Sequence, residues 1–213
     1  MAQAPSIVRE LFAGKTLARI FMNRSLASET VRGSVVDVGG GRHPDYFAYF
    51  QREHVTGIEP LDGSISGIDF EKDALPFAEG TADTVVACNV LEHIYDHRFL
   101  LGEMRRVLKA KGTLVGFVPF WVGYHPDPHD YFRYTSEALE RLLKDAGFTD
   151  VRVRSVGGGP FLANFNTIML SFPRVLRPVL YAPCVLIDRA FLALRPKSRE
   201  RNPLGFIFRA TKP

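Results

Sequence analysis

The sequence predicts an α/β fold whose sheet is largely parallel and covered by helices on both faces. Short runs of β-branched and apolar residues alternate with segments in which apolar residues recur at helical spacing. The clearest strand is TVVACN at 84–89, and the clearest helix is capped by Asp96 and continues to Leu108. Strands that alternate with helices form parallel sheets, because the helices supply the long crossover connections.

The expected elements extend over most of the chain. Strands are predicted at 35–38, 54–58, 66–70, 84–89, 113–119, 151–156 and 204–210, and helices within 7–31, at 44–52, at 96–108 and from Ser136 to Gly147. Residues 160–203 separate the last two strands and are rich in Leu, Phe, Arg and Pro, which predicts one or two inserted helices. We therefore divide the chain into an N-terminal helical cap (1–33), a main domain (34–159 and 204–213) and an inserted helical segment (160–203).

Composition is that of an ordinary globular protein, with 46% hydrophobic and 23% charged residues. Cys88 and Cys184 both lie in apolar surroundings and do not make a disulfide framework, which favours a reducing compartment and a cytoplasmic protein. No stretch reaches the roughly 18 to 20 apolar residues needed to span a bilayer. The N-terminus does not resemble a signal peptide.

Charge is distributed unevenly along the chain. Residues 1–32 carry a net charge of +3, residues 171–213 carry +7, and the middle carries −6. Basic ends on an acidic body suggest attraction to an anionic surface or substrate. The alternative is a solvated surface of uneven charge, and the sequence leaves both open.

A glycine-rich turn follows the first predicted strand, in VVDVGGGRHPDY at 35–46. Ligands of open α/β sheets bind beyond the carboxyl ends of the strands, and Gly39 and Gly41 permit positive φ and close backbone approach there. Glu59 ends the second predicted strand, 22 residues after Asp37. An acid at about this distance is suited to ribose hydroxyls. The pattern predicts a nucleoside site, and the alternative is a structural turn with a chance acid.

The turn does not fit a dinucleotide or a nucleoside triphosphate. The G-x-G-x-x-G pattern would need a third glycine where Pro44 stands, after Arg42 and His43. No lysine follows in the phosphate-loop pattern either. The expected ligand therefore has a ribose but no pyrophosphate.

Several longer motifs carry a resemblance to a known family. They are VVDVGGG at 35–41, GIEP at 57–60, ALPFAEGTADTVVACNVLEHIYD at 74–96, EMRRVLKAKGTLV at 103–115 and DAGF at 145–148. Together they resemble the class I S-adenosylmethionine-dependent methyltransferases, in particular a small bacterial family of the methyltransferase type 11 kind. The resemblance covers about residues 34–155 and the last strand. The succession of LPF, a strand and LEH is the most specific part.

The resemblance implies a Rossmann-like, doubly wound sheet of about seven strands, mostly parallel, with an antiparallel last strand. It also implies S-adenosyl-L-methionine as the cofactor of the main domain. Asp37 would order the glycine turn near the amino-acid end of the cofactor, and Glu59 would bind the ribose. The other implied cofactor residues are Gly39 and Gly41 through their backbones, Asp69 and Phe70 at the adenine, and Asn89 at the methionine part. His43 stands where the family often has glycine, which leaves the start of the first helix open.

The candidate chemistry lies in GYHPDPHDYFRYT at 123–135, after the fifth strand. This segment resembles the substrate-facing part of many bacterial methyltransferases encoded with glycan-assembly genes. Transfer to a hydroxyl is helped by a general base, and His129 is the predicted base. The predicted substrate contacts are His125, Tyr131, Arg133 and Tyr134. A hydrogen bond from His129 to backbone, fixing the loop, is an equal alternative.

Two other features of the sequence were weighed as sites. For Glu92 and His93, a structural pair at a helix start is preferred to a catalytic one. His125 and His129 are four residues apart with Asp127 and Asp130 nearby, which is a spacing seen among metal ligands. The intervening prolines disfavour a helix, so no metal is expected.

The predicted function is O-methylation of a small-molecule, glycan or lipid-linked acceptor. No Asn-Pro-Pro-Tyr type motif occupies 89–92, which disfavours methylation of a base nitrogen. The alternatives are a nucleic-acid methyltransferase, suggested by the basic ends, and a methyltransferase-like binding module without turnover.

Residues 172–196 carry the strongest surface feature of the inserted segment. The apolar run 178–187 is too short to span a membrane and is flanked by arginines at 174, 177, 189 and 195. This pattern suits a helix pair over the acceptor site or at a membrane surface. Packing on the sheet or in a homodimer interface is the alternative.

Overall fold

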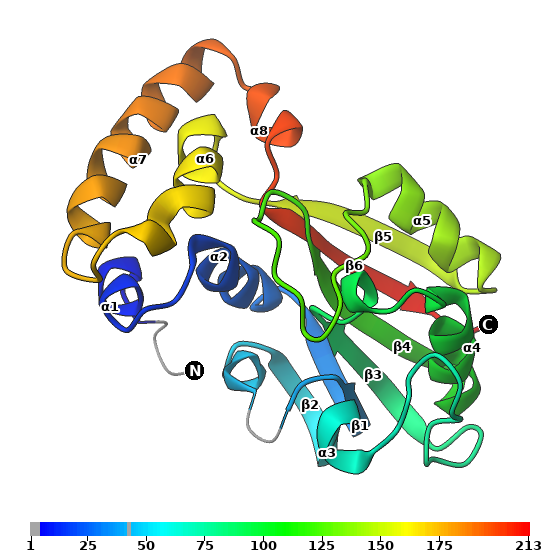
Figure 1. Cartoon of the computed structure of the whole chain (residues 1–213). Coiled ribbons are helices and arrows are strands. Elements are labelled where there is room, and N and C mark those ends of the chain that lie inside the picture. Colours follow the sequence, from blue (N-terminus) through cyan, green and yellow to red (C-terminus); the bar gives the residue numbers. More distant parts are fainter. Residues whose placement is uncertain (1–4, 42–43) are drawn as a thin grey trace.

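A computed structural model describes residues 5–41 and 44–213, except for the side chains of Ser64, Ile65 and Arg199. His43 lies outside the described residues. Six strands form one sheet in the order β2-β1-β3-β4-β6-β5 (Figure 1). They are β1 (Thr30–Val38), β2 (Gln51–Leu61), β3 (Ala82–Cys88), β4 (Leu108–Pro119), β5 (Thr149–Val156) and β6 (Gly205–Thr211).

Strand directions agree with the predicted fold. β1 is parallel to β2 and β3, and β3 is parallel to β4. The last strand, β6, runs antiparallel to both β4 and β5, as predicted. β1 and β3 are neighbours at the centre of the sheet. The chain leads from β1 to β2 on one side and from β3 to β4 on the other. This topological switch point places the carboxyl ends of β1 and β3 beside a ligand site.

The strand predicted at 66–70 is wrong. Ser66 ends the short helix α3 (Gly63–Ser66), and Gly67 then adopts a φ of +72°. The Asp69 carbonyl accepts hydrogen bonds from the amides of Lys72 and Asp73, at 3.0 and 2.8 Å, which closes a turn. The sheet therefore has six strands where about seven were expected.

One face of the sheet is covered by α4 (His97–Val107) and α5 (Ser136–Asp145) (Figure 1). The Asp96 side chain accepts from the amide of Phe99 at 3.1 Å, as expected of the predicted cap. The helix ends at Val107, one residue before its predicted end, because the chain enters β4 at Leu108. The core on this face includes Leu100, Leu101, Met104, Leu139, Leu143 and Phe208.

The opposite face is covered by α2 (Leu17–Leu26) and by η1 (Asp45–Ala48), a single turn of 3₁₀ helix within the helix predicted at 44–52. The core on this face includes Met22, Leu26, Tyr46, Phe47, Phe50, Val115 and Phe117. The sheet thus has helical elements on both faces, as predicted.

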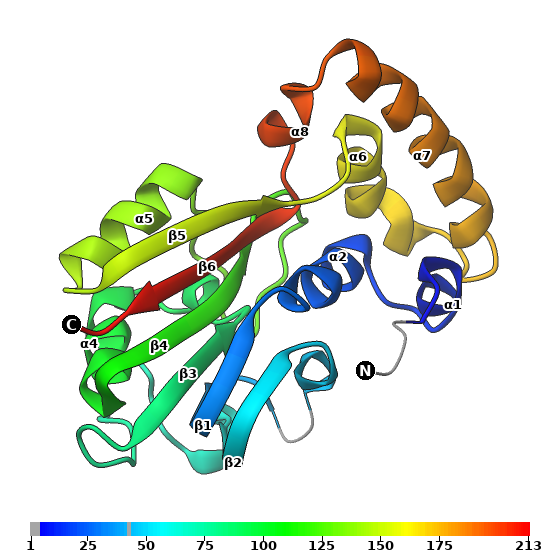
Figure 2. The same cartoon turned by 180° about the vertical axis from the view of Figure 1, so that it is seen from behind.

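A helical cap lies at one end of the sheet (Figure 2). It combines α1 (Ile7–Phe12) and α2 with the inserted segment, which contains α6 (Pro160–Ile168), η3 (Met169–Ser171), α7 (Arg177–Leu194) and α8 (Ser198–Arg201). A third apolar core joins these parts through Leu11, Leu17, Ile20, Leu162, Phe165 and Met169. The N-terminal helices and the inserted segment, 150 residues apart in the sequence, therefore pack as one cap.

Two buried polar side chains hold α6 in place. Asp188 of α7 accepts from the amides of Phe161 and Leu162, at 3.0 and 2.8 Å, and so caps the N-terminus of α6. Asn166 of α6 accepts from the amide of Ala18 at 2.9 Å, which ties α6 to α2. Within the described ranges, no helix combines the length and apolar character needed to cross a bilayer.

Candidate functional site

The turn after β1 brings backbone, rather than side chains, to the switch point. Gly39 and Gly41 have φ values of +78° and +67°. A Cβ on Gly39 would lie 2.5 Å from Val90 Cγ2, and one on Gly40 would lie 1.7 Å from the Asp37 carboxylate. Only glycine fits at positions 39 and 40, so the turn can present main chain to a ligand.

Asp37 supports this turn from behind. The carboxyl group is fully buried, and its Oδ1 accepts from the Tyr46 hydroxyl at 2.6 Å. Burial raises the pKa of Asp37 from 3.8 to about 7, although the Tyr46 hydrogen bond opposes the shift. Asp37 does not line either cavity described below. Its side chain therefore shapes the turn instead of reaching a ligand directly.

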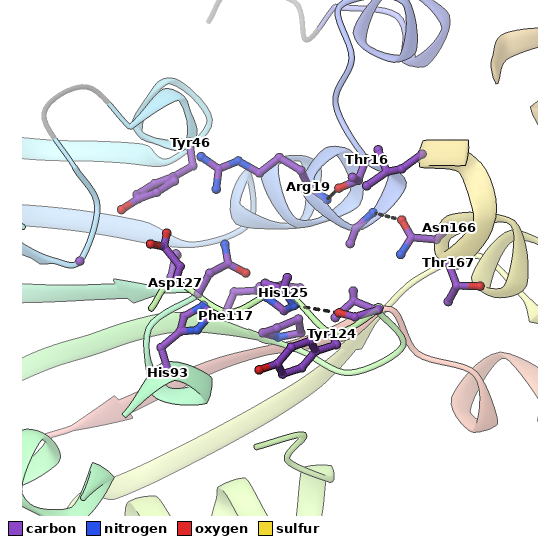
Figure 3. Close-up of a pocket in the computed structure, with 18 of the residues that line it drawn as sticks. Thr16, Arg19, Tyr46, His93, Phe117, Tyr124, His125, Asp127, Asn166 and Thr167 are labelled. Carbon is purple, nitrogen blue, oxygen red and sulfur yellow. Dashed lines mark hydrogen bonds between the residues drawn. The ribbon is translucent and has the colours of Figure 1, made fainter. Parts of the chain in front are cut away.

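A first cavity of about 570 Å³ lies between the sheet and the helical cap. Figure 3 shows residues from both sides of it, with Thr16 and Arg19 of α2 and Asn166 and Thr167 of α6 opposite Phe117, Tyr124 and His125. The Arg19 guanidinium lies 5.3 Å from the Tyr46 ring centroid and donates to Asp45 at 2.7 Å. We call this space the cap cavity.

A second cavity of about 640 Å³ lies beside the glycine turn and the segment after β2. Its lining residues include Asp62, Asp69, Phe70, Ile94, His129 and Tyr131. Asp69 accepts from the amide of Glu71 at 2.9 Å, and this bond together with the Lys72 ammonium lowers the pKa of Asp69. We call this space the turn cavity.

The two cavities share part of their walls. Gly39, Asn89, His93 and Asp127 line both of them. Asn89 follows β3 with a φ of +56°, and its backbone N–H donates to the Phe117 carbonyl at 2.9 Å. Asparagine tolerates this left-handed conformation better than most residues. The ends of β1 and β3 thus form a junction between the cap cavity and the turn cavity.

Glu59, the predicted ribose ligand, lies exposed on β2 and lines neither cavity. Asp62 lines the turn cavity instead, directly after β2 ends at Leu61. A Cβ on Gly41 would lie 3.7 Å from an Asp62 carboxylate oxygen, so this acid faces the glycine turn. The sequence analysis overlooked Asp62 because β2 continues three residues beyond its expected end.

The loop 123–135 is divided between several environments. His125 lines the cap cavity, and His129 and Tyr131 line the turn cavity. Arg133 and Tyr134 line neither of these two cavities. Arg133 donates to Asp130 at 2.7 Å, and the buried Tyr134 hydroxyl donates to the Leu91 carbonyl at 3.1 Å. These two predicted substrate residues thus make contacts within the protein.

Glu92 and His93 lie in η2 (Leu91–His93), next to the junction. The Glu92 carbonyl accepts from the amides of Tyr131 and Phe132, at 2.8 and 3.2 Å, so the backbone here holds the loop 123–135. The Glu92 side chain is fully buried, and neither carboxyl oxygen has a hydrogen-bond partner in the described structure. Burial raises the pKa of Glu92 to about 8.

Comparison with known proteins identifies the family of the chain. A family model described as a methyltransferase domain matches residues 9–153. An uncharacterized methyltransferase of Mycobacterium sp. (strain KMS) is 30% identical over 174 residues, which cover 70% of this chain and 68% of that protein.

Two solved structures illustrate the likeness in fold. An S-adenosylmethionine-dependent methyltransferase from Mesorhizobium loti superimposes with a TM-score of 0.52 at 15% identity, covering 94% of this chain and 100% of the other. Phosphoethanolamine N-methyltransferase 2 of Haemonchus contortus, in complex with S-adenosyl-L-methionine, gives 0.51 at 17% identity, covering 92% of this chain and 52% of the other. Both confirm the predicted Rossmann-like fold.

The Asp37–Tyr46 contact leads to a pH-dependent prediction. Because the folded-state pKa of Asp37 is raised, its contribution to stability is present at low pH and is lost as the pH rises from 3.8 to about 7. Tyr46→Phe removes the hydroxyl that stabilises the ionised form. We expect the free energy of unfolding to fall by about 1–3 kcal/mol at about pH 8 and by roughly half as much at about pH 5.

Urea unfolding of the ligand-free protein at the two pH values measures this difference. Tyr95→Phe is the matched control, since it removes the same atom from a ring that is 66% exposed. An equal loss of stability at both pH values would contradict the assignment of a buried, titrating Asp37.

Proposed function

Because the chain belongs to the methyltransferase domain family, we propose that it is an S-adenosylmethionine-dependent enzyme that methylates an oxygen of its acceptor. The cofactor binds in the turn cavity and the acceptor in the cap cavity. The observation that carries this proposal is the junction, where Gly39, Asn89, His93 and Asp127 line both spaces. Methyl transfer needs the two reactants in line at short distance, and two adjoining cavities supply that geometry.

In the turn cavity, each part of the cofactor meets suitable chemistry. The side chain of Phe70 offers an apolar face for adenine, and Asp69 offers an acceptor for its amine. Asp62 replaces Glu59 as the proposed partner of the ribose hydroxyls, because only Asp62 of the two lines the cavity. The backbone of Gly39 and the segment around Asn89 then receive the amino-acid part, with the sulfonium methyl directed through the junction.

The cap cavity suits an acceptor that combines an apolar part with hydroxyl groups. Tyr46, Phe117, Tyr124 and Leu170 contribute apolar surface, whereas Arg19, Thr16, Asn166 and Thr167 contribute polar groups. Residues 89–92 lack the motif of enzymes that methylate amino groups of bases, which disfavours a base nitrogen as the target. The mixed lining favours a small-molecule or lipid-linked acceptor over a nucleic-acid strand.

His129, predicted as the general base, takes a different role in this proposal. Its ring lines the turn cavity and lies 5.2 Å from the Tyr131 ring, between centroids. Its carbonyl oxygen accepts from His93 Nδ1 at 2.5 Å. We place His129 and Tyr131 over the cofactor, as part of a lid, while His125 faces the acceptor.

Cofactor affinity tests the placement of the ribose. Asp62→Asn should weaken binding of S-adenosylhomocysteine by about tenfold, or 1.4 kcal/mol, because a charge-assisted hydrogen bond to ribose is lost. Glu59→Gln is the matched control and should change affinity by less than about twofold. Calorimetry on the purified chain measures both.

The same calorimetric measurement tests whether His129 forms part of a lid over the cofactor. His129→Ala should weaken the cofactor by about threefold to tenfold while leaving turnover at saturating cofactor nearly unchanged. A loss of turnover with unchanged cofactor affinity would return His129 to the role of base. Loss of affinity in Glu59→Gln, with none in Asp62→Asn, would reject the proposed ribose site.

A lipid-linked acceptor is supported by the outer face of α7. Val179, Leu186 and Leu194 are 65%, 64% and 84% exposed, and their spacing places them on one side of the helix. Arg174, three residues before α7, and Arg189 of α7 are both exposed. An exposed apolar helix face with flanking arginines suits the surface of an anionic membrane.

Arg177 does not belong to this surface, although the sequence suggested that it did. Its side chain is buried and its Nε donates to the Phe172 carbonyl at 3.1 Å. Since α7 packs on α6, and α6 lines the cap cavity, membrane contact through α7 would place the cavity near the lipid surface.

Flotation with anionic and neutral liposomes tests this contact. Binding should require anionic lipid and weaken at high salt. Arg174→Ala with Arg189→Ala should reduce it by about 30-fold, at about 1 kcal/mol for each arginine. Arg152→Ala is the control, because Arg152 is exposed on β5 and not on the inserted segment. No binding to any liposome would favour packing against a second copy, which sedimentation would detect as a dimer.

A further inference from the structure

Three side chains with metal-ligating atoms gather next to the junction. Glu92 and His93 come from η2 and His125 from the loop after β4, and one ligand atom of each lies within 4.8 Å of the other two. We propose that Glu92, His93 and His125 bind one divalent transition-metal ion. The role of this ion rests on the proposed function, because the ion would bind the acceptor oxygen.

Glu92 is the strongest indication that a cation belongs here. It is fully buried, and both of its oxygens lack a hydrogen-bond partner in the described structure. Burial of an unpartnered carboxylate costs several kcal/mol, unless a cation or hydrogen bonds compensate it. His93 Nε2 lies 3.6 Å from Glu92 Oε1, and the positive charge of Arg133 partly opposes the rise in the pKa of Glu92. A metal ion between these groups would satisfy the carboxylate.

Both histidines have Nδ1 directed at a backbone carbonyl, which leaves Nε2 for a metal. His93 Nδ1 contacts the His129 carbonyl, and His125 Nδ1 contacts the Gly123 carbonyl at 2.9 Å. A carbonyl oxygen only accepts, so these two contacts place the proton on Nδ1; at His125 the shorter carbonyl contact competes with Arg133 Nη2, which lies 3.3 Å from the same nitrogen. In a neutral ring, Nε2 then keeps its lone pair for a metal. Ligating histidines in proteins are oriented by such bonds from their second nitrogen.

Asp130 and Arg133 complete the support of His125. Asp130 accepts from the His125 amide at 3.0 Å and from Arg133 at 2.7 Å. The guanidinium holds the pKa of Asp130 well below its usual range, and the two charges compensate each other. The positive charge of Arg133 therefore does not exclude a cation. Arg133, which lines neither the cap cavity nor the turn cavity, has this positioning role in our account.

The ligand set indicates the class of metal. Two imidazoles and one carboxylate suit Zn²⁺, Co²⁺ or Fe²⁺, whereas Mg²⁺ and Ca²⁺ prefer sets made of oxygens. Three protein ligands leave at least one position open. No metal was expected from the sequence, because the prolines between His125 and His129 disfavour a helix that would bring the two rings together. The ring of His129 is not among the three ligating side chains. Its backbone carbonyl instead accepts a hydrogen bond from Nδ1 of His93, which is one of them.

An open position on the metal would serve the proposed methyl transfer. His93 lines both cavities and His125 lines the cap cavity, so an acceptor hydroxyl could reach the ion from there. Metal coordination lowers the pKa of a bound hydroxyl, whose proton passes to water. The resulting oxyanion attacks the methyl carbon. The carbon–sulfur bond breaks, and its electron pair stays on sulfur as a neutral thioether.

Metal binding by the purified full-length chain tests the inference. After treatment with a chelator, the protein should take up one Co²⁺ per chain, with visible absorption typical of four or five ligands. Zn²⁺ should displace it. Glu92→Gln and His125→Ala should each weaken binding by at least about tenfold, as expected for removal of a ligand. His129→Ala is the matched control, because it keeps the backbone carbonyl and should bind Co²⁺ like the unaltered chain.

The readouts separate failure of this inference from failure of the proposed function. Calorimetry with S-adenosylhomocysteine on Glu92→Gln and His125→Ala reports on the folded cofactor site without any turnover. Cofactor binding with no stoichiometric Co²⁺ would overturn the metal site and leave the methyltransferase proposal standing. Equal Co²⁺ affinity in His125→Ala, Glu92→Gln and His129→Ala would also overturn it. Co²⁺ binding that depends on Glu92 and His125, without cofactor binding, would support the metal site and count against the proposed function.

Discussion

The hydrogen bond from the Tyr46 hydroxyl to the buried Asp37 carboxylate sets the geometry on which the rest of the site depends. It links the end of β1 to η1, across the glycine turn that lies between them. A side chain at position 40 would collide with this carboxylate, and one at 39 would collide with Val90. The turn is therefore confined between two packed groups, and its main chain is left as the surface that a ligand meets.

Two cavities follow from that turn because it lies at the switch point of the sheet. On one side, the segment after β2 brings Asp62, Asp69 and Phe70 to the turn cavity. On the other side, α2 and α6 close the cap cavity over the same strand ends. The hydrogen bonds that the buried side chains of Asp188 and Asn166 accept hold α6 in that position. The proposed cofactor cavity and the mixed polar and apolar cap cavity therefore share a wall, which is the arrangement that methyl transfer requires.

The sequence predicted those parts that local chemistry determines. Alternating apolar runs identified the strands, and Asp96 and the glycines at 39 and 41 were recognised from capping and turn rules. It failed at 66–70, where Gly67 and Asp69 form a turn in a segment with strand-like composition. Glu59 was proposed from its distance of 22 residues from Asp37. This spacing does not show that β2 extends to Leu61 and places Asp62 at the turn cavity. The cluster of Glu92, His93 and His125 depends on a loop returning to η2 from 32 residues away, and no local pattern encodes that approach.

The central claim is that cofactor and acceptor approach each other through the junction formed by Gly39, Asn89, His93 and Asp127. A crystal structure of the chain with S-adenosylhomocysteine tests it most directly. We predict adenine beside Phe70, the ribose hydroxyls at Asp62, and the sulfur at Asn89 and His93, with the cap cavity left open above it. A nucleoside bound in the cap cavity, under α2 and α6, would contradict the account.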